Sequence, residues 1–295
     1  MATEAEVLEA LQVTMSAAYT QGLDAASPQW SMVASEVPSS GASNYYGWMA
    51  DIPGIKEWIG DRQLADLGKY GYAVENKTWE TSIKIKRETY EDDQIGIYSP
   101  IAKKFGQDVA LFPDELSYGL LKLGFSELCF DGQPYFDTDH PNGAQGVYSN
   151  IVGDPAATGP AWFLLDGSQI LKPIIYQNRR KFVFKNMNPN EEYSWFNNEY
   201  VAGTDGRCNV GFGLPQVCVA SKEPLNADTY AAAVKMLGQM KKTSGVALGI
   251  KHSHLVVGHE NRAAGKAILN TMLANGGDTN IYYQDAELVV SPYLD

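Results

Sequence analysis

The chain has 295 residues, of which 44% are hydrophobic and 20% are charged. This composition excludes a disordered or collagen-like chain and allows a sizeable core, in about two domains or one elaborated domain. Lys and Arg number 23 against 35 Asp and Glu, for a net charge of −12. The acidic balance argues against a protein that coats duplex DNA, because such proteins need a strongly cationic surface.

No apolar run approaches the roughly 20 residues of a membrane-spanning helix, so we expect no membrane partner. The acidic start of the chain also lacks the basic region of a secretory signal. Three cysteines, Cys129, Cys208 and Cys218, occur without a CxxC pair. They indicate buried thiols in a reducing compartment and not a disulfide framework.

The first segment is predicted to be a short helix followed by an extended arm. Apolar residues recur at helical spacing up to Ala18, and residues 22–41 are then rich in Ser, Pro and Ala. Such a stretch has few large apolar side chains with which to build a core. It is either a disordered terminus or an arm that becomes ordered against a neighbouring subunit.

Residues 70–90 are predicted to form a β-hairpin with its turn at residues 75–77. Apolar and polar residues alternate from Trp79 to Lys86, which is typical of a half-exposed strand. The hairpin is either solvated or reaches over a neighbour, in which case its opposite charges complement each other between identical copies. The candidate intersubunit contacts are Trp79, Lys84, Lys86, Arg87, Glu91, Asp92 and Asp93.

A long helix is predicted over residues 99–123. Ser99 is a favourable N-cap and Pro100 a favourable first helical residue. Apolar residues then recur at steps of three and four along one face. Pro113 is expected to kink or split this helix, and Gly124 to end it.

The remainder of the chain alternates strand and helix patterns. Strands are predicted over residues 161–165, 174–176, 181–184, 216–219, 254–257 and 287–290, and helices over residues 226–242 and 261–274. The last third is therefore expected to be a compact α/β unit.

Three carboxylates and an imidazole stand close together in the sequence, at Asp131, Asp137, Asp139 and His140. One interpretation is a soluble metal-dependent enzyme that uses Asp137, Asp139 and His140 for cation binding or acid–base chemistry. The intervening Gly, Pro and Thr residues are instead typical of tight turns, in which Asp caps its own backbone. We favour the structural turn.

Other catalytic and binding motifs are incomplete. His252, His254 and His259 suggest zinc, but no HExxH motif accompanies them. No complete nucleotide-binding loop and no GxSxG motif occurs. The aromatic residues beside residues 179–181 are explained by a strand core more simply than by a surface for single-stranded nucleic acid. We predict no catalytic residue, no metal ligand and no cofactor.

Seven segments, in order along the chain, resemble the major head subunit family of Mu-like phages and prophages. They are residues 46–48, 57–62, 92–98, 113–116, 131–141, 162–166 and 288–294. The similarity extends from about residue 28 to the C-terminus.

The resemblance implies the α+β Hong Kong 97 phage major capsid protein fold. It places an N-terminal arm at residues 1–45 and an extended β-hairpin loop at residues 68–98. It implies a peripheral domain over residues 46–67 and 99–224, with a spine helix at residues 99–123 and a β-sheet. The axial domain is residues 225–295.

The implied function is that of the major capsid protein of a Mu-like tailed phage. Its copies are expected to form pentamers and hexamers of an icosahedral head around double-stranded DNA, which is bound without sequence specificity. Further expected partners are scaffold, portal and decoration proteins. The expected location is the virion, with the host cytoplasm during assembly.

Two features of some capsids of this fold are not expected here. The short arm argues against a large fused scaffold, and nothing near Lys77 or Lys84 identifies the carboxylate that Lys–Asn cross-linking needs. The competing classes are the metal-dependent enzyme and a tail or nucleic-acid accessory protein. Particle size separates them from a shell protein.

Overall fold

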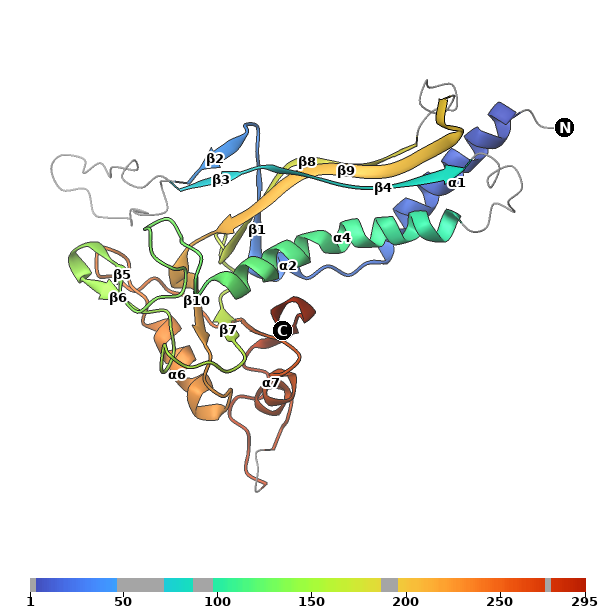
Figure 1. Cartoon of the computed structure of the whole chain (residues 1–295). Helices are drawn as coiled ribbons and strands as arrows, with labels where there is room; N and C mark the ends of the chain where they lie inside the picture. The colour runs from blue at the N-terminus through green and yellow to red at the C-terminus, as the bar shows by residue number, and fades with distance from the viewer. Residues whose placement is uncertain (1–3, 47–71, 87–97, 187–195, 274–276) are drawn as a thin grey trace.

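The computed structural model describes residues 4–46, 72–86, 98–186, 196–273 and 277–295. It contains two four-stranded sheets, a long helix and several shorter elements (Figure 1). The helices are α1 (Glu4–Ala25), α2 (Trp30–Val33), α4 (Tyr98–Leu123), α6 (Ala227–Gly238) and α7 (Arg262–Leu269). The mixture of helices and sheets agrees with the predicted α+β class.

The first sheet is elongated and has strand order β1-β8-β9-β4. We call it the sheet arm, which is distinct from the N-terminal arm at residues 1–45. Its strands are β1 (Ala34–Pro38), β4 (Lys77–Lys86), β8 (Ile174–Asn186) and β9 (Glu199–Phe212). The two segments predicted as separate strands at residues 174–176 and 181–184 are one strand, β8, with register shifts between Asn178 and Val183. Beyond Pro38, β1 no longer covers β8, so the outer part of this sheet has three strands.

The predicted hairpin over residues 70–90 is wrong in its strand pairing. The short strand β3 (Ala73–Glu75) pairs with β2 (Ser43–Tyr45), whereas β4 pairs along its whole length with β9. Asn76, expected in a turn, donates its side-chain amide to Ser39 Oγ and to the Gly41 carbonyl, at 2.9 and 3.0 Å. Asn76 therefore holds the chain in place where it passes from the β2-β3 sheet to the first sheet.

Helix α4 confirms the predicted long helix and lies along one face of the elongated sheet (Figure 1). Pro113 stands inside it without ending it. Asp114, the next residue, turns its carboxylate to the chain before α2, where it accepts the backbone N–H groups of Gln29 and Trp30 at 2.6–3.0 Å. Burial raises the pKa of Asp114, although these two N–H bonds act in the opposite direction. One residue of the long helix therefore caps the N-terminus of α2.

Two glycines allow α1 to pack closely on α4 within the same chain. A Cβ on Gly22 would overlap the Lys103 carbonyl, and a Cβ on Gly106 would overlap the Tyr19 carbonyl. Met15 and Ala18 of α1 are buried at this contact, together with Ala102 of α4 and Ile85 of β4. The N-terminal segment thus has an ordered place on its own subunit.

The second sheet has strand order β10-β7-β11-β12 and forms the centre of the core. Its strands are β7 (Trp162–Leu165), β10 (Cys218–Ser221), β11 (His254–Val257) and β12 (Glu287–Val290). Alternate residues of a strand point to opposite faces. Trp162 and Leu164 pack with α6 and α7, whereas Phe163 and Leu165 pack with the C-terminal end of α4. The sheet is therefore covered on both faces, which explains its uninterrupted apolar strands.

Candidate functional site

The best candidate for a chemical site is a corner of the chain between α4 and the short strands β5 (His140–Pro141) and β6 (Val147–Tyr148). The backbone folds back on itself here, with Cys129 N–H donating to Gln133 O and Tyr135 N–H donating to Glu127 O. Gly132 occupies the turn with φ +83°, a conformation that L side chains rarely adopt. The turn predicted from the Gly and Pro pattern is confirmed.

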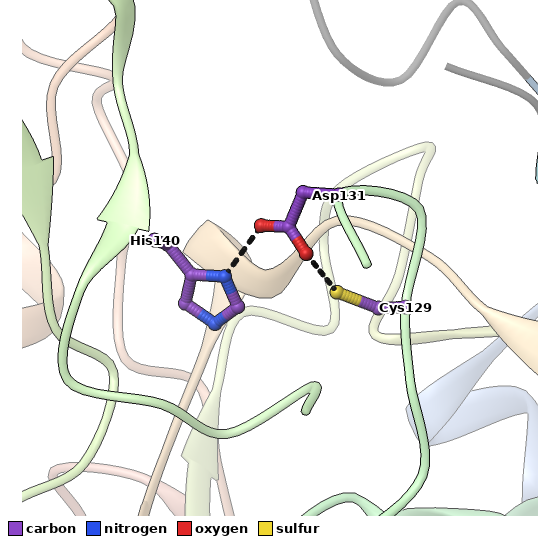
Figure 2. A group of neighbouring side chains, drawn as sticks. All are labelled: Cys129, Asp131 and His140. Carbon is purple, nitrogen blue, oxygen red and sulfur yellow. Dashed lines mark hydrogen bonds and ion pairs between the residues drawn. The ribbon is translucent and has the colours of Figure 1, made fainter. Parts of the chain in front are cut away.

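Three potential metal ligands meet inside this corner: Cys129, Asp131 and His140 (Figure 2). His140 Nδ1 lies 2.7 Å from Asp131 Oδ2, and Cys129 Sγ lies 3.0 Å from Asp131 Oδ1. The His140 side chain is 0% exposed and that of Asp131 is 1% exposed. Figure 2 shows the carboxylate between the imidazole and the thiol, one oxygen towards each.

Hydrogen bonds determine the charge of Asp131. Burial opposes its ionised form, but hydrogen bonds from His140, Cys129 and the Gln133 backbone N–H outweigh this effect and lower the pKa of the carboxyl. The opposite holds for the Cys129 thiol, whose pKa is raised by burial and by the neighbouring Asp131. A thiol with a raised pKa is a poor nucleophile at neutral pH.

The remaining contacts of His140 complete a closed network. Its Nε2 lies 3.1 Å from the Tyr135 carbonyl, which can only accept a hydrogen bond. Its ring stacks on Tyr148, with 5.1 Å between ring centroids. Both ring nitrogens are therefore occupied by partners within the chain, and the imidazole ties Asp131 and Tyr135 to the strand that follows.

The corner fits a metal ion poorly. Structural zinc sites are almost always closed by four protein ligands, whereas the metal-ligand group among the described residues has three members. Asp131 already uses both oxygens for hydrogen bonds. The hydrogen bonds of this corner form a structural link between two loop segments and not an open reaction centre.

The metal-dependent enzyme predicted as an alternative needs Asp137 and Asp139 beside His140. The structure instead joins His140 to Asp131 and Cys129. Asp137 caps the Thr138 backbone N–H at 2.6 Å, and Asp139 accepts from Gln133 Nε2 at 3.3 Å. Cys129 was missing from the sequence-based cluster, although its position two residues before Asp131 in a tight turn was a usable signal.

The three C-terminal histidines do not converge on one site. His252 Nε2 lies 3.0 Å from Asp285, and His254 contacts Ser253 Oγ and Glu287. Burial lowers the pKa of His254, although Glu287 acts against this effect. His259 stands after β11, where its carbonyl accepts the Arg262 N–H. Each histidine has a local structural role.

The candidate intersubunit residues lie partly on the sheet arm. Lys84 and Lys86 are exposed, and Lys84 pairs with Glu199 at 3.3 Å. Trp79 is half-buried: it packs edge-on against Phe112 of α4 and donates its indole N–H to the Cys208 carbonyl at 3.0 Å. Arg87, Glu91, Asp92 and Asp93 lie outside the described residues. In the part of the chain that the structure describes, no helix is both long and apolar enough to cross a membrane.

Comparison with known proteins identifies the family to which this chain belongs. A family model, the Mu-like prophage major head subunit gpT, matches residues 8–294. The major capsid protein of Escherichia phage Mu is 35% identical over 97% of this chain and 98% of its own length. The Mu-like prophage FluMu major head subunit of Haemophilus influenzae is also 35% identical, over 98% of both chains.

Solved structures agree with the family match. The chain in the procapsid of bacteriophage JBD30 is 36% identical, with a TM-score of 0.86 over 99% of this chain and 100% of that chain. The chain in the JBD30 capsid matches with 28% identity and a TM-score of 0.78, over 91% of this chain and 92% of that chain. The fold is therefore the Hong Kong 97 phage capsid fold, as predicted.

These matches cover the whole length of the relatives and concern structural proteins of phage heads, so the enzyme alternative is rejected. The protein is a structural component of the virion. The chain belongs to the Mu-like prophage major head subunit gpT family and is the major capsid protein of a Mu-like phage.

Proposed function

We propose that copies of this chain associate into pentamers and hexamers, and that these rings tile an icosahedral head that encloses double-stranded DNA. The observation that carries the proposal is the whole-length similarity to the JBD30 procapsid chain. Contacts around a ring of identical subunits are heterologous, so each copy presents two different complementary surfaces. The elongated shape of the molecule provides surfaces that lie far apart (Figure 1).

The proposed division of labour follows the domain boundaries predicted above. Residues 1–45 act as the arm, 46–67 and 99–224 as the peripheral domain, 68–98 as the extended loop and 225–295 as the axial domain. Support comes from the sheet arm, in which β4 of the extended loop projects together with β8 and β9 (Figure 1). The extended loop is thus proposed to act with the β8–β9 strands.

The axial domain offers an apolar contact for the ring axis. The side chains of Met272, Leu273 and Ile281 are exposed on the segment between α7 and β12. Asn280 fixes this segment to the end of α7, because its side-chain amide donates to the carbonyls of Ile268 and Thr271, at 2.7 Å each. Exposed apolar side chains on a fixed segment suit burial against a neighbouring copy.

The proposed contacts of the extended loop are Trp79, Lys84, Lys86, Arg87, Glu91, Asp92 and Asp93. Lys84 and Lys86 are exposed, and Lys84 also pairs with Glu199 of its own chain. Trp79 contributes indirectly, because its packing on Phe112 holds β4 against α4.

Further partners are proposed from the related heads. One JBD30 capsid structure, with 26% identity and a TM-score of 0.77, is described as decorated with minor capsid protein trimers. We propose a similar decoration here, together with scaffold and portal proteins during assembly in the host cytoplasm. DNA is proposed to be enclosed without sequence-specific contacts, in line with the net charge of −12.

Electron microscopy and sedimentation of the purified full-length chain test the proposal. We expect closed megadalton shells built from rings of five and six subunits. A chain that sediments only as a monomer or small oligomer under all salt and protein concentrations, and under co-expression with a scaffold protein, would refute it.

A further inference from the structure

The outward face of the sheet arm carries an excess of positive charge. On β4 the even-numbered residues are exposed, and their register partners on β9 are odd-numbered, so these side chains share the face turned away from α4. We call this surface the sheet face. Its cations are Lys84, Lys86, Arg180, Lys181, Lys185 and Arg207, and its anions are Glu80, Glu199 and Asp205. Six cations against three anions stand out in a chain with a net charge of −12.

Within the sheet face, like charges are placed directly opposite each other. Arg180 on β8 and Arg207 on β9 are register partners, an arrangement that is destabilising by itself. Asp205 is shared by Arg180 and Lys185, the latter at 3.0 Å. Lys181 has no ion pair among the described residues. The described residues alone do not balance the positive charge of this surface, which therefore favours an acidic partner.

The sequence contains a matching acidic region. Residues 126–171 include no Lys or Arg but six Asp and Glu residues. Two of these, Asp131 and Asp166, are buried in hydrogen-bond networks. Glu127 and Asp139 are exposed and Asp137 is half-buried, all on the corner described above. We call Glu127, Asp137 and Asp139, together with the exposed Leu128, the acidic corner.

Among the described residues, the charged side chains of the two surfaces form no ion pair with each other. β4, β8 and β9 run to the upper right in Figure 1, whereas β5 and β6, which follow the acidic corner in the sequence, lie at the left. A contact between them joins two copies head to tail, which is the heterologous geometry that rings of identical subunits require.

We infer that the sheet face of one copy binds the acidic corner of a neighbouring copy. This inference rests on the proposed shell function and identifies one of its contacts. Each surface has an exposed aliphatic side chain among its charges, Val183 at 50% and Leu128 at 58% exposure. An aliphatic side chain and three interspersed carboxylates suit a protein surface and not the uniformly negative backbone of DNA.

The experiment compares assembly of full-length chains that carry charge reversals. One chain carries Lys181→Glu and Arg207→Glu, a second carries Glu127→Lys and Asp139→Lys, and a third carries all four changes. These positions avoid Asp137, which caps its own loop. At about 0.05 M salt, we expect each double variant to need roughly fivefold more protein for half-maximal assembly, and the combined variant to return to within about twofold of wild type. At higher salt, we expect smaller differences between the variants and wild type in the protein concentration needed for half-maximal assembly.

A matched control separates the proposed pairing from a general effect of net charge. Lys235 and Lys266 are exposed on α6 and α7 and belong to neither surface. Lys235→Glu with Lys266→Glu gives the same charge change as the sheet-face variant. Combined with Glu127→Lys and Asp139→Lys, it restores net charge but not complementarity, so we expect no recovery of assembly. Unassembled chains should all melt near the wild-type temperature.

Three results would overturn the inference. The first is a fourfold variant that assembles no better than either double variant. The second is equal recovery with the control lysines. The third is normal assembly of the sheet-face variant combined with loss of packaged DNA, which makes this face a DNA contact. If wild-type chains form no shell at all, the proposed function itself fails.

Discussion

Replacement of Asp131 tests whether the hydrogen bonds of the corner stabilise the fold. Asp131→Ala removes the acceptor of hydrogen bonds from His140, Cys129 and the Gln133 backbone, and leaves a fully buried imidazole without its partner. Breaking a buried pair in this way costs about 3–5 kcal/mol. At about 2 °C per kcal/mol for a chain of this size, the melting temperature should fall by about 6–10 °C.

Asp131→Asn is the matched variant. Its side-chain carbonyl still accepts from Cys129 and Gln133, and its amide can donate to a neutral His140 that keeps Nε2–H on the Tyr135 carbonyl. The expected loss is therefore only about 1–2 kcal/mol. Urea unfolding of unassembled chains measures both values at neutral pH.

The pH dependence has a defined sign. Because the folded state lowers the pKa of Asp131 below its ordinary 3.8, the ionised carboxylate stabilises the fold above that value. This contribution is lost as the pH falls through the lowered pKa, so the difference in unfolding free energy between wild type and Asp131→Asn should shrink as the pH falls below about 4. Equal stability of wild type and Asp131→Ala at pH 7 would contradict a structural role for the hydrogen bonds of Asp131. Destabilisation of wild type by a chelator would make these groups metal ligands.

Three further variants test the packing and the charges. Gly106→Ala should destabilise the chain by about 2 kcal/mol through its clash with α1, whereas Gly119→Ala on the same helix, where a Cβ meets nothing within 4 Å, should stabilise it by about 1 kcal/mol; equal effects in thermal melts would contradict the tight α1–α4 contact. Asp114→Ala should cost about 1–2 kcal/mol and increase hydrogen exchange at the N–H groups of Gln29 and Trp30, and unchanged exchange there would show that the cap is unimportant. Charge reversal on the extended loop should reduce particle yield most at low salt, and a yield independent of salt would exclude an electrostatic role; the reversed residues are Lys84, Lys86 and Arg87.

The long helix and the second sheet were predictable because their signals are local. The stripe of apolar residues in α4 and the continuous apolar strands β7 and β11 report burial directly. Asn226, the first residue of the helix predicted over residues 226–242, is the N-cap of α6, and its side chain accepts from the N–H groups of Asp228 and Thr229. In each case the deciding interactions connect residues within a few turns or within one strand.

The pairing of β4 could not be predicted because its partner is distant in sequence. β4 and β3 are separated by one residue and alternate as a hairpin does, yet β4 pairs with β9, so that Lys77 stands opposite Cys208. Only the folded chain shows that Asn76 is fixed by Ser39 and Gly41. The partner of His140 could not be predicted for the same reason, because sequence spacing alone does not show which of the nearby carboxylates it contacts.

Pro113 gives the long helix a mechanical property. It has no N–H with which to bond the Val109 carbonyl, so the helix has one hydrogen bond fewer at this point and bends more easily there. The half before it carries α1 and the sheet arm, and the half after it is embedded in the core through Tyr118 and Leu121. Bending at Pro113 changes the angle between the first sheet and the core, which is the kind of adjustment that identical subunits need in flatter and in more sharply curved surroundings.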